Sequence, residues 1–137
     1  MKHKPYLTQA DVNVLLQGAN DFAEKNQFAV AIAVVDDGGH LLGFTRRDGC
    51  PAVSATIAQE KAKSSALGRK ESKAYEDMIN GGRIAYLSVP VLQGMLEGGV
   101  NIIHEGHTIG AIGVSGVKSS EDAQIAKAGI SAWLAQN

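Results

Sequence analysis

Several features that mark common classes of protein are scarce in this sequence. Its 137 residues include one cysteine, which cannot form an intrachain disulfide, and no cluster of cysteine and histidine has the spacing of a zinc site. Aromatic residues make up only 5% of the chain. We therefore expect residues 1–137 to form a single domain around a core of small side chains, which a chain of this length can bury.

Long apolar runs and an excess of one charge are also absent. Residues 1–5 are not followed by the apolar run of a secretory signal, and no stretch approaches the ~18 apolar residues of a membrane span. The formal net charge of -1 argues against the basic face that nonspecific nucleic-acid binding requires. We expect a soluble, cytoplasmic protein without nucleic-acid or membrane partners, and a single cysteine agrees with a reducing compartment.

Glycine, with 16 residues, is abundant, which indicates close approach of backbones. Residues 28–35 are continuously apolar, with β-branched side chains on one parity and mostly alanine on the other. This pattern predicts a central strand covered on both faces, with a helix close against its alanine side. The turn Asp36-Asp37-Gly38-Gly39 then predicts that residues 40–47 return as an antiparallel strand.

Helical periodicity accounts for most of the remaining chain. It predicts helices over residues 8–25, 52–68 and 72–79, and a last helix capped by Ser119 or Ser120. Residues 100–104 and 107–115 are predicted to form a hairpin, and residues 83–99, which are too apolar for a solvated linker, a packed and irregular crossing. The fold class is α+β, an antiparallel sheet of about five strands with helices packed on it, in the order α-β-β-α(α)-β-β(β)-α.

Gly110, Gly113 and Gly116 lie in or directly after the last predicted strand. Their spacing is neither that of a dinucleotide-binding fingerprint nor that of a Walker motif, and they do not open a helix. Glycine inside a strand leaves room either for a helix packed close on the sheet or for a flat ligand. The sequence leaves these two alternatives open.

Three histidines are candidate ligands. His104 and His107 flank the turn of the second predicted hairpin, so their Cβ atoms should lie about 5 Å apart on one face. Such a pair would bind a transition metal, or one imidazole would ligate haem iron; otherwise both belong to a solvated hairpin tip. His40 opens the strand after the first turn, where it would contact a ligand or point to solvent.

Arg47, Asp48 and Cys50 converge at the loop before the second predicted helix. A haem propionate or a small carboxylic acid there would meet Arg47 and the N–H groups of the helix start. Alternatively, Arg46 or Arg47 pairs with Asp48, and Cys50 is buried as a small hydrophobe. Lys61, on an apolar face of that helix, either snorkels to solvent or meets the same anion.

Two segments resemble those of a known family. The first contains Asp36, Gly39, Leu41, Phe44, Arg47, Asp48, Gly49, Lys61 and Ala62. The second contains Gly98, Gly99, Gly106 and the run from Ile109 to Gly116. Together they resemble the haem-degrading family, also called the GlcG/HbpS family, and are similar to the C-terminal domain of PduO-type cobalamin adenosyltransferases. The resemblance covers most of the chain.

The resemblance implies a homo-oligomer, a dimer or higher, that binds haem or another tetrapyrrole, with a corrinoid as a further cofactor candidate. Some members are linked to slow haem breakdown with peroxide. An imidazole, His104 first and then His40, would ligate iron, and Arg47 or Lys61 would meet the propionates. No nucleophile and base arrangement is evident in the sequence, so enzyme activity stays open.

The resemblance also implies an alternative role, because family members are encoded beside genes of glycolate, glycerol and propanediol utilisation. The chain would then be an accessory protein or enzyme that binds a small organic acid or diol-derived metabolite. We expect that ligand at the corner formed by Arg47, Asp48 and Lys61. A third hypothesis is a structural oligomer without a small-molecule ligand.

Overall fold

A computed structural model describes all residues from 1 to 137. In chain order the elements are α1 (Gln9–Lys25), β1 (Ala31–Asp36), β2 (Leu41–Arg46), α2 (Ala52–Gly68), α3 (Ser72–Asn80), the 3-10 helix η1 (Ile84–Ser88), β3 (Gly99–His104), β4 (His107–Ser115) and α4 (Ser119–Leu134). The α+β class and the element order are confirmed. The sheet has four strands, not about five, because residues 83–98 form η1 and turns instead of an additional strand.

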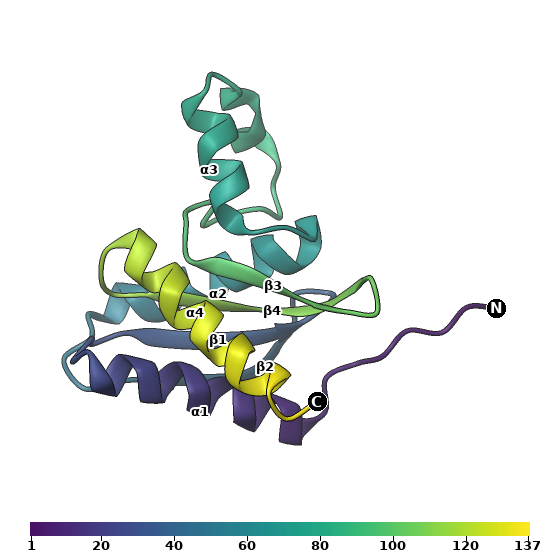
Figure 1. Cartoon of the computed structure of the whole chain (residues 1–137). Helices are drawn as coiled ribbons and strands as arrows, with labels where there is room; N and C mark the ends of the chain where they lie inside the picture. Colours follow the sequence, from purple (N-terminus) through teal and green to yellow (C-terminus); the bar gives the residue numbers. More distant parts are fainter.

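The four strands form one antiparallel sheet in the order β2-β1-β4-β3 (Figure 1). Helices α1 and α4 pack against each other and cover one face, where the β-branched side chains of β1 join the larger core cluster. Helix α2 covers the other face, where Ala31 and Ala33 meet Ala58 and Ala62. The predicted central strand with a helix on its alanine side is confirmed.

The glycines of β4 allow α2 to approach the sheet closely. A Cβ atom on Gly113 would overlap the carbonyl oxygen of Ala58 and the backbone nitrogen of Ala62. A Cβ on Gly110 would overlap the carbonyl oxygen of Val35 on the neighbouring strand. At Gly113 the backbone of α2 therefore fills the space, which confirms the close-packed helix there and leaves no room for a flat ligand. At Gly110 the space is filled by the neighbouring strand and the Leu7 side chain, not by a helix.

The start of α1 is tied to the end of α4 through one carboxylate. Thr8 caps α1, its hydroxyl accepts the N–H of Asp11 at 3.2 Å, and Asp11 accepts the N–H of Thr8 at 2.8 Å. The other oxygen of Asp11 accepts the indole N–H of Trp133 at 2.9 Å. The hydrogen bond from the Thr8 backbone, followed by that from Trp133, lowers the pKa of Asp11.

Residues 72–98, which contain α3 and η1, form an arm that stands away from the sheet (Figure 1). The prediction of a packed crossing over residues 83–99 is wrong for most of this segment, since η1 has no buried residue. The crossing is irregular, as predicted, but apart from Met95 its large apolar side chains are exposed or only half-buried. None of the helices is long and apolar enough to cross a membrane.

Candidate functional site

A cavity of about 510 Å³ lies where the end of α2, the β1–β2 turn and the β3–β4 hairpin meet. We call it the hairpin cavity, and it is lined by Lys4, Asp37, Ala66, Leu67, Arg69, Ile103, Gly106, His107 and Thr108. Its volume falls in the range of ~300–1,000 Å³ that is typical of small-molecule sites. Alanine, leucine and isoleucine side chains provide apolar lining, while three basic groups, the Asp37 carboxylate and the Thr108 hydroxyl provide polar contacts.

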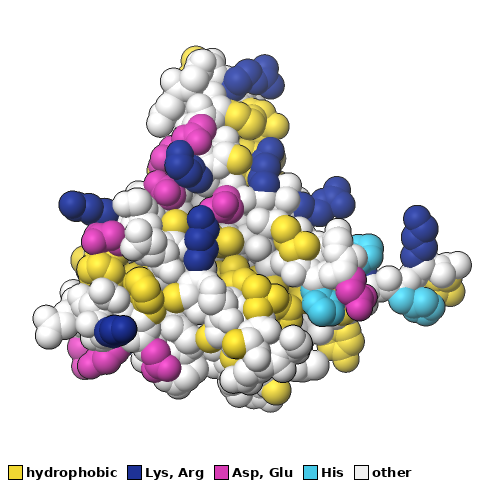
Figure 2. Space-filling model, in the orientation of Figure 1, with side chains coloured by type: hydrophobic (Ala, Val, Ile, Leu, Met, Phe, Trp, Pro, Cys, Tyr) yellow, Lys and Arg dark blue, Asp and Glu magenta, His cyan; other side chains and the backbone are white.

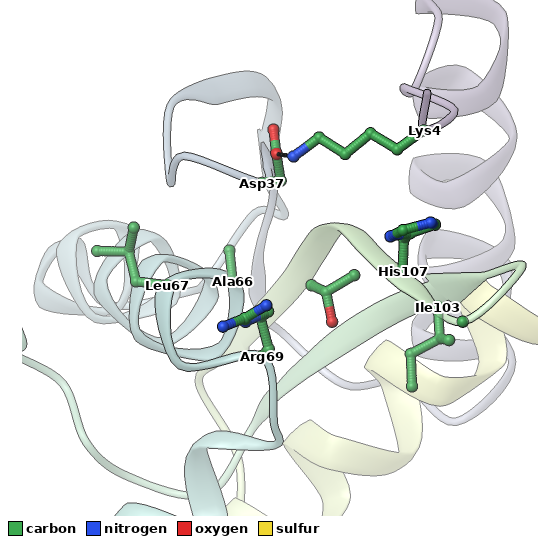
Figure 3. Close-up of a pocket in the computed structure, with 9 residues that line it drawn as sticks. Lys4, Asp37, Ala66, Leu67, Arg69, Ile103 and His107 are labelled. Atoms are coloured by element: carbon green, nitrogen blue, oxygen red, sulfur yellow. Dashed lines mark hydrogen bonds and ion pairs between the residues drawn. The ribbon is translucent and has the colours of Figure 1, made fainter. Parts of the chain in front are cut away.

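Two of the basic groups in the hairpin cavity have no protein partner. Lys4 forms an ion pair with Asp37, and both reach the cavity from one side (Figure 3). Arg69 and His107 lie on opposite sides of the hollow (Figure 3), and neither side chain forms an ion pair or a hydrogen bond with the protein. An anionic ligand would therefore find a guanidinium and an imidazole without a competing carboxylate on either.

The backbone at Arg69 supports a role for its side chain. Arg69 ends α2 in the left-handed conformation, with φ +56°, and its N–H donates to the carbonyl of Ala66. Glycine is the usual residue at such a helix end, and a non-glycine residue there costs on the order of 1 kcal/mol. Strain of this kind is typical of functional sites, and here it places a guanidinium beside the cavity.

The predicted hairpin brings His104 and His107 directly opposite each other in the β3–β4 ladder, as expected. Their surroundings differ, however. The ring of His104 packs edge-on against Trp133, with centroids 5.9 Å apart, and its Nε2 lies 3.7 Å from Glu105. His107 instead lines the hairpin cavity. No group of three metal-ligating side chains forms in the molecule, so these imidazoles have no third protein ligand for a metal ion.

His40 is held by the turn that precedes it. Its Nδ1 lies 3.1 Å from the Asp36 carboxylate, which also accepts the backbone N–H groups of Gly38 and His40 at 2.9 Å each. Burial raises the pKa of Asp36, but the hydrogen bonds from His40 and Gly38 outweigh it and lower the pKa overall. The imidazole is 80% exposed and does not line the hairpin cavity.

Arg47 binds α1 instead of a neighbour in its own loop. Its guanidinium donates to the side-chain oxygen of Asn20 at 2.9 Å and forms an ion pair with Glu24. The predicted ion pair between Asp48 and either adjacent arginine is wrong, because Asp48 is exposed and forms none. Cys50 is buried, as the alternative interpretation of this corner predicted. A ligand carboxylate would have to compete with Glu24 for Arg47.

Lys61 is buried, so neither prediction for its side chain is correct. Its ammonium donates to Asp122 and to the carbonyl of Val114, each at 3.0 Å, and the Lys61 and Asp122 side chains are only 3% and 2% exposed. Burial raises the pKa of Asp122, although the Lys61 ammonium acts to lower it. Because Lys61 projects from α2 and Arg47 binds α1 across the sheet, the two do not form the predicted anion-binding corner.

Comparison with known proteins identifies the family. The family model described as haem degrading protein HbpS-like matches residues 7–131. The chain belongs to this HbpS-like family. Protein GlcG of Escherichia coli is 48% identical to it over 115 residues, which span 84% of this chain and 85% of GlcG. The resemblance inferred from the two sequence segments is thus confirmed.

Solved structures of HbpS-like relatives share the fold. A structure of the PduOC haem complex is 27% identical, has a TM-score of 0.85, and covers 93% of this chain and 95% of the PduOC chain. A double mutant of HbpS from Streptomyces reticuli is 26% identical, also with a TM-score of 0.85, and covers 96% of this chain and 89% of HbpS. The PduOC structure contains haem.

Within this HbpS-like chain, the sequence did not single out most of the residues that meet at the hairpin cavity. Arg69 and Lys4 had no motif around them, and Thr108 belongs to an ordinary strand pattern. His107 was predicted only as the partner of His104. The one available signal was Gly68-Arg69 at a helix end, where the glycine precedes the left-handed position and an arginine occupies it.

Proposed function

We propose that this member of the HbpS-like family binds haem or a related tetrapyrrole at the hairpin cavity. His107 would be the axial ligand, and Arg69, whose guanidinium forms no ion pair with the protein, would bind the propionates. The observation that carries the proposal is that an imidazole and an unpaired guanidinium face one cavity of ligand size. Imidazole is a common axial ligand of haem iron, and arginine is well suited to bind carboxylates.

The order of candidate axial ligands differs from that expected from sequence. His104 becomes the second candidate because it lies opposite His107 but packs against Trp133. His40 comes third, since the Asp36 carboxylate holds its imidazole. Arg47, Asp48 and Lys61 are not part of the proposed site, because Arg47 and Lys61 already bind carboxylates of the protein.

A small organic acid or diol-derived metabolite is the second candidate ligand. The observation that favours it is the polar character of the cavity, where Arg69, His107 and the hydroxyl of Thr108 lie within reach of a small carboxylate. In this case the acid would occupy the hairpin cavity, not the corner near Arg47. A corrinoid is a further tetrapyrrole to test, since the family resemblance extends to cobalamin adenosyltransferases.

Three further parts of the proposal concern assembly, activity and location. We propose a homo-oligomer, slow breakdown of bound haem with peroxide, and a cytoplasmic location. The free, buried Cys50 agrees with a reducing compartment. A peroxide-dependent loss of Soret absorbance in the haem-loaded protein, absent from a variant that does not bind haem, would support the breakdown activity.

The binding test is a haemin titration followed by absorbance. The wild type should give a saturable Soret shift, which His107→Ala should abolish. Arg69→Ala should weaken binding roughly ten- to a hundredfold, since a hydrogen bond to a charged group is worth about 1.5–3 kcal/mol. His40→Ala is the control and should bind like the wild type.

Two outcomes would contradict the haem proposal. One is an absence of any saturable shift in the wild type, and the other is full binding by both His107→Ala and Arg69→Ala. Thermal stabilisation by organic acids that is lost in Arg69→Ala but kept in Arg47→Ala would then support the second candidate ligand.

A further inference from the structure

The arm exposes more large apolar side chains than a solvated segment normally does. Ile84, Leu87 and Val91 are 68%, 66% and 55% exposed, and Leu96 is 44% exposed. Hydrophobic side chains accordingly appear on the surface of the arm in Figure 2. Contiguous apolar surface of this kind marks an interaction site in a soluble protein.

The same arm also contains an apolar groove. A cavity of about 390 Å³ lies between α3 and the segment after η1, and its apolar lining comes from Ile79, Leu87, Leu92, Met95 and Leu96. The arm therefore combines projecting side chains, those of Ile84 and Val91, with a groove that can accept side chains of this size. Two copies of such a surface can be complementary to each other.

The arm also carries one cation near its projecting side chains and one anion near its groove. Glu76 lines the groove and forms no ion pair. Its carboxylate accepts the backbone N–H of Glu97 at 3.3 Å, and its charge also acts on the Lys73 ammonium, which pairs with Asp77. Arg83, at the start of η1, forms no ion pair; its guanidinium lies 5.7 Å from the ring centroid of Tyr86. One arm thus offers an unpaired cation beside its projecting side chains and an unpaired anion beside its groove. The net charge of -1 leaves little repulsion between copies.

We propose that the arm docks onto the arm of a second copy of this chain. In a two-fold arrangement, Ile84 and Val91 of each copy would enter the groove of the other, and Arg83 would pair with Glu76. An interface of this type uses the same patch on both copies, which is what a self-complementary surface requires. The inference rests on the homo-oligomer of the proposed function and assigns its interface.

Reversing the charges of Arg83 and Glu76 tests whether the arm forms the dimer interface. Oligomeric state would be measured by sedimentation equilibrium for the wild type, Arg83→Glu, Glu76→Arg and the double variant. Each single reversal should weaken the dimer at least tenfold because it places like charges together, and the double variant should restore it. Arg46→Glu on the exposed strand β2 is the matched control and should assemble like the wild type. Leu87→Asp should give a folded monomer by circular dichroism.

The possible failures are distinguishable. A wild type that stays monomeric would overturn both this inference and the proposed oligomer, while the haemin titration would still decide the ligand proposal separately. A wild-type oligomer that persists in both single reversals and in Leu87→Asp would overturn only the arm as its interface. Dissociation by Arg46→Glu alone would move the interface to β2.

Discussion

At the scale of residues, the buried ion pair between Lys61 and Asp122 holds two helices together and does not bind a ligand. The two residues are 61 positions apart and join α2 to the start of α4. Asp122 also accepts the N–H of Val117 at 3.2 Å, so both of its oxygens are bonded. The sequence singled out Lys61 because a lysine interrupts an apolar face, but it contains no local signal for a partner so distant. Lys61 therefore binds the Asp122 carboxylate, not the ligand carboxylate that was predicted.

Lys61→Met should lower the free energy of unfolding by about 3–5 kcal/mol at neutral pH, because it leaves the Asp122 carboxylate buried without a counterion. Folding raises the pKa of Asp122 above its ordinary value of 3.8. The protonated carboxyl therefore favours the folded state below pH 3.8, and this contribution to the free energy of unfolding is lost as the pH rises through the pKa of the folded protein. The deficit of Lys61→Met should accordingly shrink in acid. Urea unfolding at neutral and acidic pH measures both effects.

The matched control for that variant is Lys61→Met combined with Asp122→Asn. Replacing the Asp122 carboxylate as well should recover part of the lost free energy of unfolding at neutral pH. The remaining difference from the wild type should then depend little on pH. A double variant no more stable than Lys61→Met would show that the lysine acts through packing alone.

At the scale of elements, apolar side chains that repeat every two residues in strands and every 3.6 residues in helices were sufficient to predict most of the fold. The continuous run in β1, with alanine on one parity, predicted both its central position and its close helix, because small side chains are what a close helix requires. The segment 83–99 could not be predicted in the same way. Its apolar character predicted a packed segment, but most of its side chains are exposed in the folded chain. Sequence alone does not specify whether a surface of the same chain covers such a segment.

Gly113→Ala should destabilise the protein by about 1–3 kcal/mol or more, since the added methyl group would overlap the backbone of α2 and the helix would have to move. Gly106→Asn is the control, because nothing lies within 4 Å of its Cβ position and asparagine tolerates the positive φ of +78°. Denaturant unfolding compares the two. Equal losses in the two variants would contradict the close packing of α2 on β4.

At the scale of the whole molecule, the candidate site is built from segments that are distant in sequence. Lys4, Asp37, Arg69 and His107 come from the N-terminal segment, a turn, a helix end and a hairpin. Family membership could be predicted because its signature lies in two local runs of glycine and apolar residues. The cavity could not, because its lining depends on how four segments meet in space, and the conspicuous Arg47 and Lys61 are bound by carboxylates of the protein.

The most direct test of the central claim is to map the ligand on the folded protein. Amide resonances of the wild type would be followed by two-dimensional NMR during titration with zinc protoporphyrin, a diamagnetic stand-in for haem. Binding at the hairpin cavity should shift the resonances of residues 66–69 and 103–108 and leave those of the arm unchanged. Shifts confined to residues 20–24 and 45–48, around Arg47, would contradict the proposed site.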